Sequence, residues 1–299
     1  MTLGAVAIGF AAQALAPQPH RSHDAALLEA LVDAPAAAQD TRADAEALRR
    51  VQSQRLGLRE PAVGRPLALE IRVALLRAGA LPRLSADAPW QLISRDGRVL
   101  AQGDPGEAVD HAWLALAPEA WLVAPEGTLR VNGQPYGGRV RLIREGSGVL
   151  LVNHVPLERY VASVVGAEMP SSWAMEALRA QAVAARSYAL AHMARPASRH
   201  WHLGDTTRWQ AYRGQASSSE RTRQATSSTE GLILSYQGGI VESLYAANRQ
   251  ITLEAHGHLG ASMSQHGAQD LAMQGLRYNE ILGRYYQGAS LARLQAGAR

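Results

Sequence analysis

The strongest constraint on the fold is an alanine-rich stretch from Glu176 to Met193, which contains no glycine and no proline. Alanine has the highest intrinsic helix propensity, so this stretch predicts one long helix. Ser171 or Ser172 would cap its start, and Glu176 in the first turn favours the positive end of the helix dipole. Because small alanine side chains let neighbouring elements approach closely, we expect this helix to lie at the centre of the fold.

Residues 68–155, which precede this helix, show the alternation of apolar and polar side chains that is typical of β-strands. The clearest alternating runs are Leu69–Leu75, Trp90–Ile93 and Arg139–Ile143, and glycine-containing turn signals lie between them. We therefore predict a single mixed α+β domain over residues 63–292. Its N-terminal half is β-rich, and the alanine-rich helix is central.

Shorter elements flank the long helix. A short helix is expected over 157–166, and Glu168-Met169-Pro170 ends it. A polar loop over 198–214 follows the long helix, and a further helix is expected over 218–230. The remaining elements are a hairpin of 232–236 with 240–245, and a helical tail over 268–286 that Gly275 interrupts.

The N-terminal region resembles an export signal. The stretch from Leu3 to Ala16 is apolar and uncharged, and it ends in Ala14-Leu15-Ala16, a small-x-small cleavage pattern, although the basic start of a signal peptide is missing. We expect residues 1–19 to be signal-like and the protein to be exported to the periplasm or cell wall; the alternative is an alanine-rich tail. Residues 20–62 predict a helical stalk or linker, and no later run is long enough for a membrane span.

The composition excludes several kinds of chemistry. The chain has no cysteine, which excludes disulfides, thiolate catalysis and cysteine-based zinc sites. All 30 basic residues are arginine, so no lysine is available for Schiff-base chemistry. The net charge of +4 suits an anionic partner such as a cell wall, whereas the scattered arginines argue against nucleic acid.

A set of specific motifs lies in the second half of the chain. The motifs are Asn153–Tyr160, Val164–Pro170, Glu176–Ala189, Asp205–Thr207, Gln210–Gly214, Met263–Ala268 and Tyr285–Gly288. As a set, they resemble the stage II sporulation protein D family, also called the amidase-enhancer family. The stretch from residue 68 fits the family's β-rich front half more loosely.

The resemblance implies a peptidoglycan lytic transglycosylase. Such enzymes cut the glycan between N-acetylmuramic acid and N-acetylglucosamine and leave a 1,6-anhydro sugar. The implied partners are peptidoglycan glycan strands. Other members have been described as enhancers of a cell-wall amidase, so a non-catalytic glycan-binding enhancer is the alternative function.

The resemblance implies that Glu168 is the catalytic residue. One glutamate can protonate the leaving oxygen and then deprotonate the 6-hydroxyl of the sugar, which requires a dry site that raises its pKa. Val164, Val165, Met169 and Trp173 provide apolar neighbours. The alternative is an ordinary acidic residue near a helix N-terminus.

The resemblance also implies a set of substrate-binding residues. Arg186 would hold acetamido or carboxylate groups of the sugar, and its alternative role is an ion pair that supports the helix. For Tyr188, Gln210 and Tyr212, sugar binding and ordinary packing stay equally open. The full predicted set is Arg186, Tyr188, Gln210, Tyr212, His258, Ser264 and Gln265.

Two features separate this chain from the family. Some relatives carry zinc in the loop near Asp205; here that loop has the pair His200-x-His202 but no cysteine, so we predict no metal and no cofactor. A metal-binding surface protein that uses this pair and His256-x-His258 is the weakest of three hypotheses. Residues 248–256 replace several dozen residues of the family's strand and loop. This apparent deletion favours the non-catalytic alternative.

Overall fold

The computed structural model describes residues 32–33, 57–65, 67–247 and 262–295. The predicted signal-like segment (1–19), most of the predicted helical segment (20–62) and the shortened stretch near 248–256 lie outside these residues. So do His256 and His258. Described parts of the segment predicted to be helical are not helical: Val32–Asp33 forms strand β1, and residues 57–62 are irregular.

Pairing with other elements accounts for this difference. Strand β1 pairs with β16 (Ser290–Leu294) in antiparallel fashion. The backbone N–H of Leu58 donates to the Asn279 carbonyl (3.1 Å), and Asn279 Nδ2 donates back to the Leu58 carbonyl (3.0 Å). Tertiary partners therefore override the local helical pattern here.

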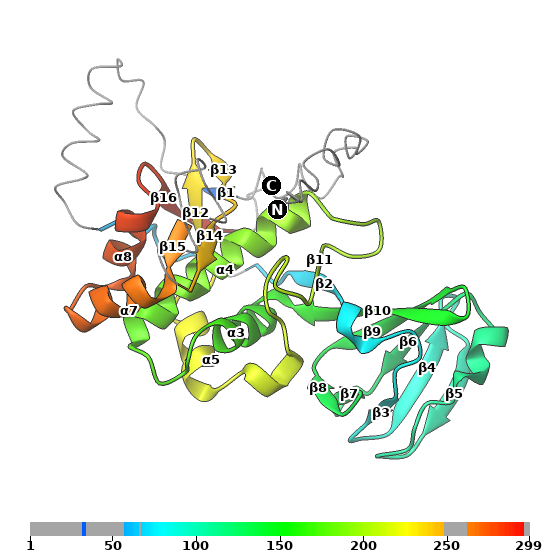
Figure 1. Cartoon of the computed structure of the whole chain (residues 1–299). Coiled ribbons are helices and arrows are strands. Elements are labelled where there is room, and N and C mark those ends of the chain that lie inside the picture. Colours follow the sequence, from blue (N-terminus) through cyan, green and yellow to red (C-terminus); the bar gives the residue numbers. More distant parts are fainter. Residues whose placement is uncertain (1–31, 34–56, 66, 248–261, 296–299) are drawn as a thin grey trace, which may run out of the picture.

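A seven-stranded sheet forms the β-rich half, as the alternation predicts (Figure 1). All its neighbouring strands are antiparallel except β11 and β2. Inward side chains such as Ile71, Leu142 and Leu122 are fully buried, because every second residue points to one face. In order, the strands are β11 (Leu203–Gly204), β2 (Glu70–Ala74), β10 (Gly148–Pro156), β9 (Arg139–Glu145), β6 (Glu119–Val123), β4 (Trp90–Ser94) and β5 (Val99–Gly103).

Smaller sheets and 3-10 helices complete this layer and the opposite end of the molecule. A three-stranded sheet contributes Leu84 and Leu129 to the main core. The elements are β3 (Leu84–Ala86), β7 (Leu129–Val131) and β8 (Gln134–Tyr136); β12 (Leu232–Tyr236) and β13 (Gly239–Ile240), which join β1 and β16; β14 (Leu244–Ala246) and β15 (Ser262–Ser264); and η1 (Leu76–Ala78), η2 (His111–Ala115) and η3 (Gly214–Ser217).

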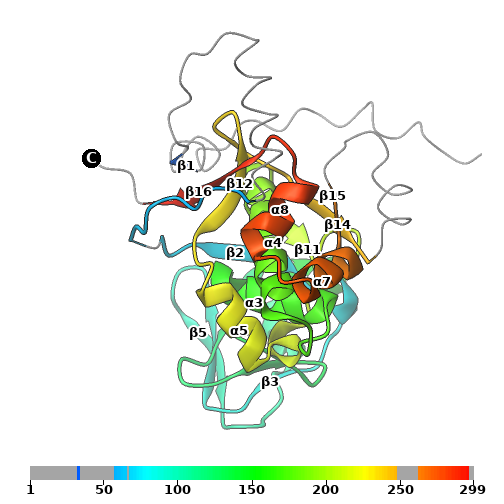
Figure 2. The same cartoon turned by 90° about the vertical axis from the view of Figure 1, so that its left-hand side faces the viewer.

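The alanine-rich helix is central, which confirms the prediction. Helix α4 (Met175–Ala194) contacts α3 (Leu157–Glu168), α5 (Glu220–Ser227), α7 (Gln265–Met273), α8 (Tyr278–Tyr285) and β12. Figure 2 shows α3, α5, α7 and α8 gathered around it. Together with the sheets, these helices confirm a mixed α+β fold. None of the helices in the described residues is long and apolar enough to cross a membrane.

The start of α4 differs from the prediction. Its N-cap is Ala174, without a capping side chain, so neither Ser171 nor Ser172 caps it. The side chain of Gln269 accepts instead from the Ala174 N–H (2.8 Å). The Glu176 carboxylate accepts from Arg179 (2.6 Å) and from the Tyr278 N–H (2.9 Å), so long-range partners fix this end.

The predicted hairpin is only partly formed. Strands β12 and β13 pair over two residue pairs, and the chain then leaves that sheet. Strand β14 pairs in parallel with β15, which places Tyr245 opposite Met263. This non-local pairing carries the segment with Ser264 and Gln265 toward the end of α3.

Gly166 allows α3 to lie against η3. A Cβ at this position would collide with the backbone carbonyl oxygen of Ser217. Gly166→Ala should therefore lower the free energy of unfolding by about 2 kcal/mol, as is typical of overpacking. Urea denaturation followed by circular dichroism measures this change. Gly239→Ala, whose Cβ would make only an ordinary contact, is the control and should change stability little.

Candidate functional site

Glu168 is the last residue of α3, and three chain segments converge on its carboxyl group. Oε1 accepts a hydrogen bond from the backbone N–H of Ala211 (2.9 Å). Oε2 lies 3.5 Å from Nε2 of Gln265, the first residue of α7. The Met169 N–H donates to the Val165 carbonyl, which ends the helix at this point. The helix end, the loop before η3 and the start of α7 therefore form one site.

Burial raises the pKa of Glu168 above its ordinary value. The hydrogen bonds from Ala211 and Gln265 and the positive charge of Arg213 act in the opposite direction, but they do not outweigh burial. Tyr160 is buried close by, and Tyr245 is partly buried. Burial raises the pKa values of both tyrosines, and the charge of Glu168 adds to this effect. The Glu168 carboxyl group therefore lies in a low-dielectric environment, which favours its protonated form.

Gln210 holds the loop that donates to Glu168. It is fully buried, its Oε1 accepts from the Tyr160 hydroxyl (2.8 Å), and its Nε2 donates to the Ala185 carbonyl (3.1 Å). Its Nε2 also donates to the Tyr245 hydroxyl (2.7 Å). These contacts fix the next residue, Ala211, so Gln210 has the position of a supporting residue and does not face a ligand.

Tyr212 has the contacts of a packing residue. It is buried, and its hydroxyl donates to Oδ1 of Asn153 (2.7 Å). Its ring lies 5.0 Å from that of Tyr160 and 5.9 Å from that of Tyr136, measured between centroids. The structure therefore matches the packing alternative, with Asn153 of the motif as its partner.

The guanidinium of Arg186 has the contacts of the alternative role, an ion pair that supports the helix. It is fully buried, and its Nε and Nη2 donate to the two carboxylate oxygens of Glu158 (2.8 and 2.6 Å). Nη1 and Nη2 also donate to the carbonyls of Leu232 (3.0 Å) and Thr226 (3.2 Å). The bidentate pair with Glu158 joins α4 to α3, and the bonds to the two carbonyls join α4 to β12 and α5. Arg186 therefore has the surroundings of a residue that supports the helix.

The other predicted ligands have different surroundings. Tyr188 is buried beside His192 (4.5 Å between ring centroids). Burial raises its pKa, and the charges of Glu242 and Glu168 add to this effect. Ser264 caps α7 by accepting from the Gly267 N–H (3.1 Å), so it has a structural partner. Among the described predicted ligands, the side chain of Gln265 is the one that bonds to Glu168.

Sequence patterns alone did not identify three groups at the site. They are the backbone N–H of Ala211, the Tyr160 hydroxyl and Tyr245. Every residue except proline has a backbone N–H, so no residue type marks the one at Ala211. The two tyrosines belong to the site through their hydrogen bonds to Gln210, which is distant from both in sequence. Trp173, expected as an apolar neighbour, packs edge-on against His266 (5.1 Å between ring centroids).

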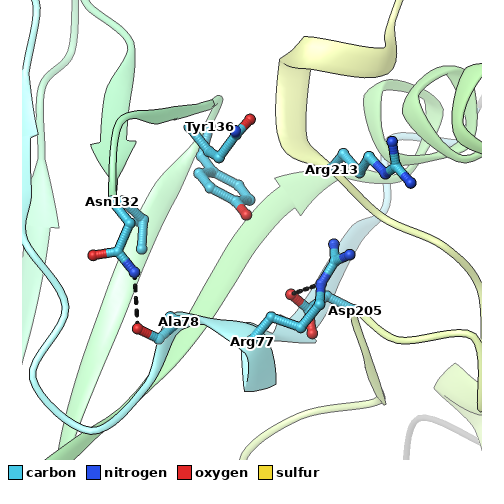
Figure 3. Close-up of a pocket in the computed structure, with 8 residues that line it drawn as sticks. Arg77, Ala78, Asn132, Tyr136, Asp205 and Arg213 are labelled. Carbon is cyan, nitrogen blue, oxygen red and sulfur yellow. Dashed lines mark hydrogen bonds and ion pairs between the residues drawn. The ribbon is translucent and has the colours of Figure 1, made fainter.

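A cavity of about 370 Å³ is lined in part by Arg213, which lies two residues after Ala211 in the chain (Figure 3). Arg77 pairs with Asp205 (3.3 Å) on one side of it, and Tyr136 lies on another side. Arg213 lines the cavity and also acts electrostatically on Glu168.

The histidine pair of the loop has protein partners. The backbone N–H of Arg72 donates to Nδ1 of His202 (3.0 Å), and Nε of Arg72 lies 2.9 Å from Nε2. Burial, followed by the charge of Arg72, lowers the pKa of His202 to about 3. Within residues 57–65, 67–247 and 262–295, no three His, Cys, Asp or Glu residues gather as a metal ligand set.

Removing the Gln265 donor should raise the pKa of Glu168 further. Gln265→Met keeps the side-chain length but deletes a hydrogen bond that favours the ionised form. A ¹³C NMR titration of the Glu168 carboxyl measures the change. Gln269→Met, on the same helix but bonded to Ala174, is the control and should leave this pKa unchanged. A fall in the pKa of the Gln265 variant would contradict the assignment.

Comparison with known proteins connects this site to one family. Residues 145–236 match the family model described as Stage II sporulation protein. The matched residues include Glu168, α4 and the loop through Gln210, which confirms the predicted resemblance over this segment. The motifs at 263–268 and 285–288 lie outside the match.

Three relatives illustrate the similarity. An uncharacterized protein of Brachyspira hyodysenteriae is 35% identical over 118 residues, which are 39% of this chain and 32% of the relative. An amidase enhancer of Bacillus subtilis is 34% identical over 99 residues (33% and 13%). Stage II sporulation protein D of Bacillus subtilis is 33% identical over 109 residues (31% and 32%). The chain thus spans about a third or less of the length of these relatives.

Proposed function

We propose that this protein is exported, acts on peptidoglycan glycan strands in the cell wall, and cleaves them as a lytic transglycosylase. The observation that carries the proposal is the half-buried Glu168 carboxyl, which has a raised pKa and two hydrogen-bond donors. The names of the relatives, stage II sporulation protein D and amidase enhancer, support a role at the cell wall.

In the proposed reaction, protonated Glu168 gives its proton to the glycosidic oxygen. The bond between this oxygen and the anomeric carbon of N-acetylmuramic acid breaks, and N-acetylglucosamine leaves with a new 4-hydroxyl group. The Glu168 carboxylate then takes the proton of the 6-hydroxyl on the same N-acetylmuramic acid. The 6-oxygen bonds to the anomeric carbon, which forms the 1,6-anhydro ring and restores protonated Glu168.

The electrostatics suit both halves of this reaction. Before cleavage, the raised pKa of Glu168 favours the protonated form, which has a proton to donate. After cleavage, the Ala211 N–H, the Gln265 amide and the charge of Arg213 stabilise the carboxylate. The reaction needs no second carboxylate and no attacking water, unlike ordinary glycoside hydrolysis.

The cavity that Arg213 lines offers space for a sugar, and the charge of Arg213 also acts on Glu168. Its lining combines the guanidinium groups of Arg77 and Arg213 with the Tyr136 ring and the Asn132 side chain. Such a mixture of donors and an aromatic surface is typical of sites that bind polar ligands. We assign it as part of the proposed glycan site.

The test is to incubate the purified protein with peptide-free glycan strands and analyse the products by mass spectrometry. Anhydro-muramyl ends are expected from the wild-type protein. Glu220→Gln, which removes an exposed carboxylate from the first turn of α5, is the control and should give the same products. Reducing ends, or uncut strands, would overturn the proposed reaction.

A non-catalytic enhancer of a cell-wall amidase is the second candidate function. It is favoured by the printed name of one relative, the amidase enhancer. Its test is the turnover of a cell-wall amidase with and without this protein. Stimulation that Glu168→Gln retains, together with glycan binding but no cleavage, would favour this candidate over the first.

A further inference from the structure

A second cleft, with a volume of about 470 Å³, lies on the β-rich half of the molecule. Its lining comes from the end of β4, the start of β6, strand β9 and the loop after α4. These elements are distinct from the end of α3 and the start of α7, which hold Glu168 and Gln265. Figure 1 shows β4, β6 and β9 displaced from α5 and α7.

The cleft is strongly basic. Its charged lining residues are Arg95, Glu119, Arg141, Arg144 and Arg199, so four guanidinium groups face one carboxylate. Only Arg141 is paired with that carboxylate, which belongs to Glu119. The remaining three arginines are exposed and leave an excess of positive charge.

These three guanidinium groups have many donors to spare. Within the described residues, Arg144 gives one bond, from Nη1 to the Leu114 carbonyl (2.6 Å). Nε of Arg199 lies 2.9 Å from Nε2 of His200. Within the same described residues, the Arg95 side chain has no hydrogen-bond or ion-pair partner. Each guanidinium carries five N–H groups, so most donors around the cleft are open to a ligand.

The positive charges around the cleft act on a histidine that lines it. His200 lines it, and its pKa is lowered by partial burial and then by the charges of Arg141 and Arg199. A neighbouring cation disfavours the imidazolium form, so the histidine reports the charge of the cleft. An anion bound here should reverse this effect and raise the pKa of His200.

The number and arrangement of the arginines favour phosphate over carboxylate. A carboxylate tends to pair with a single guanidinium group. In this protein, for example, both carboxylate oxygens of Glu158 accept hydrogen bonds from Arg186. A tetrahedral phosphate offers three acceptor oxygens in different directions, so that several guanidinium groups can bind it together. We propose that the cleft lined by Arg95, Arg144 and Arg199 is an anion-binding site for a ligand that carries phosphate groups.

Calorimetric titration of the full chain at pH 8 tests the proposal with two probes of similar charge, pyrophosphate and citrate. Pyrophosphate should bind, with an affinity that falls as salt rises. The double variant Arg95→Ala/Arg144→Ala should weaken binding at least 10-fold, and because both side chains are exposed it should stay folded. The control, Arg59→Ala/Arg83→Ala, makes the same charge change at exposed residues outside the cleft and should bind as the wild type does.

A second measurement separates binding in the cleft from general attraction to a basic protein. NMR titration of the His200 ring should show a higher pKa with pyrophosphate than without it. Citrate binding as tight as pyrophosphate, equal losses in the two double variants, or an unmoved His200 pKa would each overturn the proposal. None of these results depends on cleavage of glycan, so they are independent of the proposed function.

Discussion

Glu168→Gln is expected to reduce formation of anhydro-muramyl ends roughly 10³-fold, the size typical of losing a general acid and base. The substitution keeps the shape of the side chain and its place beside the Ala211 N–H, but it removes the transferable proton. The readout is the initial rate of product formation from peptide-free glycan strands, measured by mass spectrometry. A variant that still forms these products at the wild-type rate would exclude Glu168 as the catalyst.

The same substitution should make the protein more stable at neutral pH. The pKa of Glu168 is higher in the folded protein than its ordinary value, so the unfolded chain loses this proton first as pH rises. The free energy of unfolding therefore falls until the pH has passed the raised pKa. Glutamine cannot ionise, so Glu168→Gln should gain about 1 kcal/mol at neutral pH, typical of a stabilising active-site substitution. Thermal unfolding at neutral and acidic pH measures this gain, which should vanish in acid.

These two effects separate a catalytic acid from a structural one. An acid that mainly held the fold together would have a lowered pKa, and its removal would destabilise the protein. Loss of activity combined with unchanged or higher stability is the signature expected of Glu168. A large loss of stability in Glu168→Gln would instead show that the carboxyl group supports α3 and the loop at Ala211.

The helical core was predictable because its signals are local. The alanine-rich composition of α4 and the break at Gly275 act within a few residues, and both predictions are confirmed. The end of α3 at Glu168 also follows from the adjacent Pro170. The local pattern is misleading where a partner distant in sequence determines the backbone conformation. Asn279 bonds to Leu58 in a segment predicted to be helical, and Gln269 replaces the predicted serine cap at Ala174.

The position of the Glu168 carboxyl at the end of a helix was predictable, but its surroundings were less so. Glu168 and Gln265 do come together, although 97 residues separate them, because β14 and β15 pair in parallel. Glutamine and tyrosine are residue types that often bind sugars, so Gln210 and Tyr212 were candidates. The structure shows that their polar atoms are hydrogen-bonded to Tyr160 and Asn153 instead. A polar residue in a motif is thus ambiguous until its partner is known.

Arg186→Leu is expected to lower the free energy of unfolding by about 3 kcal/mol. Removing the guanidinium takes away the donors that Arg186 supplies to the Glu158 carboxylate and the Leu232 carbonyl. The Thr226 carbonyl also loses one donor but keeps those from Thr229. We expect a loss of stability at the lower end of the range for broken buried ion pairs. The reason is that the Glu158 side chain is 31% exposed, so water can reach the carboxylate. Urea denaturation measures the change. Arg179→Leu, on the same helix and paired with Glu176 at a partly exposed position, should cost only about 0.5 kcal/mol.

The double variant Arg186→Leu/Glu158→Leu tests whether the pair itself is the cause. Because it removes both charges, it should recover part of the stability lost in Arg186→Leu, as apolar replacements of buried ion pairs generally do. A residue that bound glycan would behave differently: Arg186→Leu would fold normally and raise KM, and a change at Glu158 would not compensate. Recovery in the double variant would therefore make Arg186 the link that holds α4 against α3, and Glu168 would owe its position to that link.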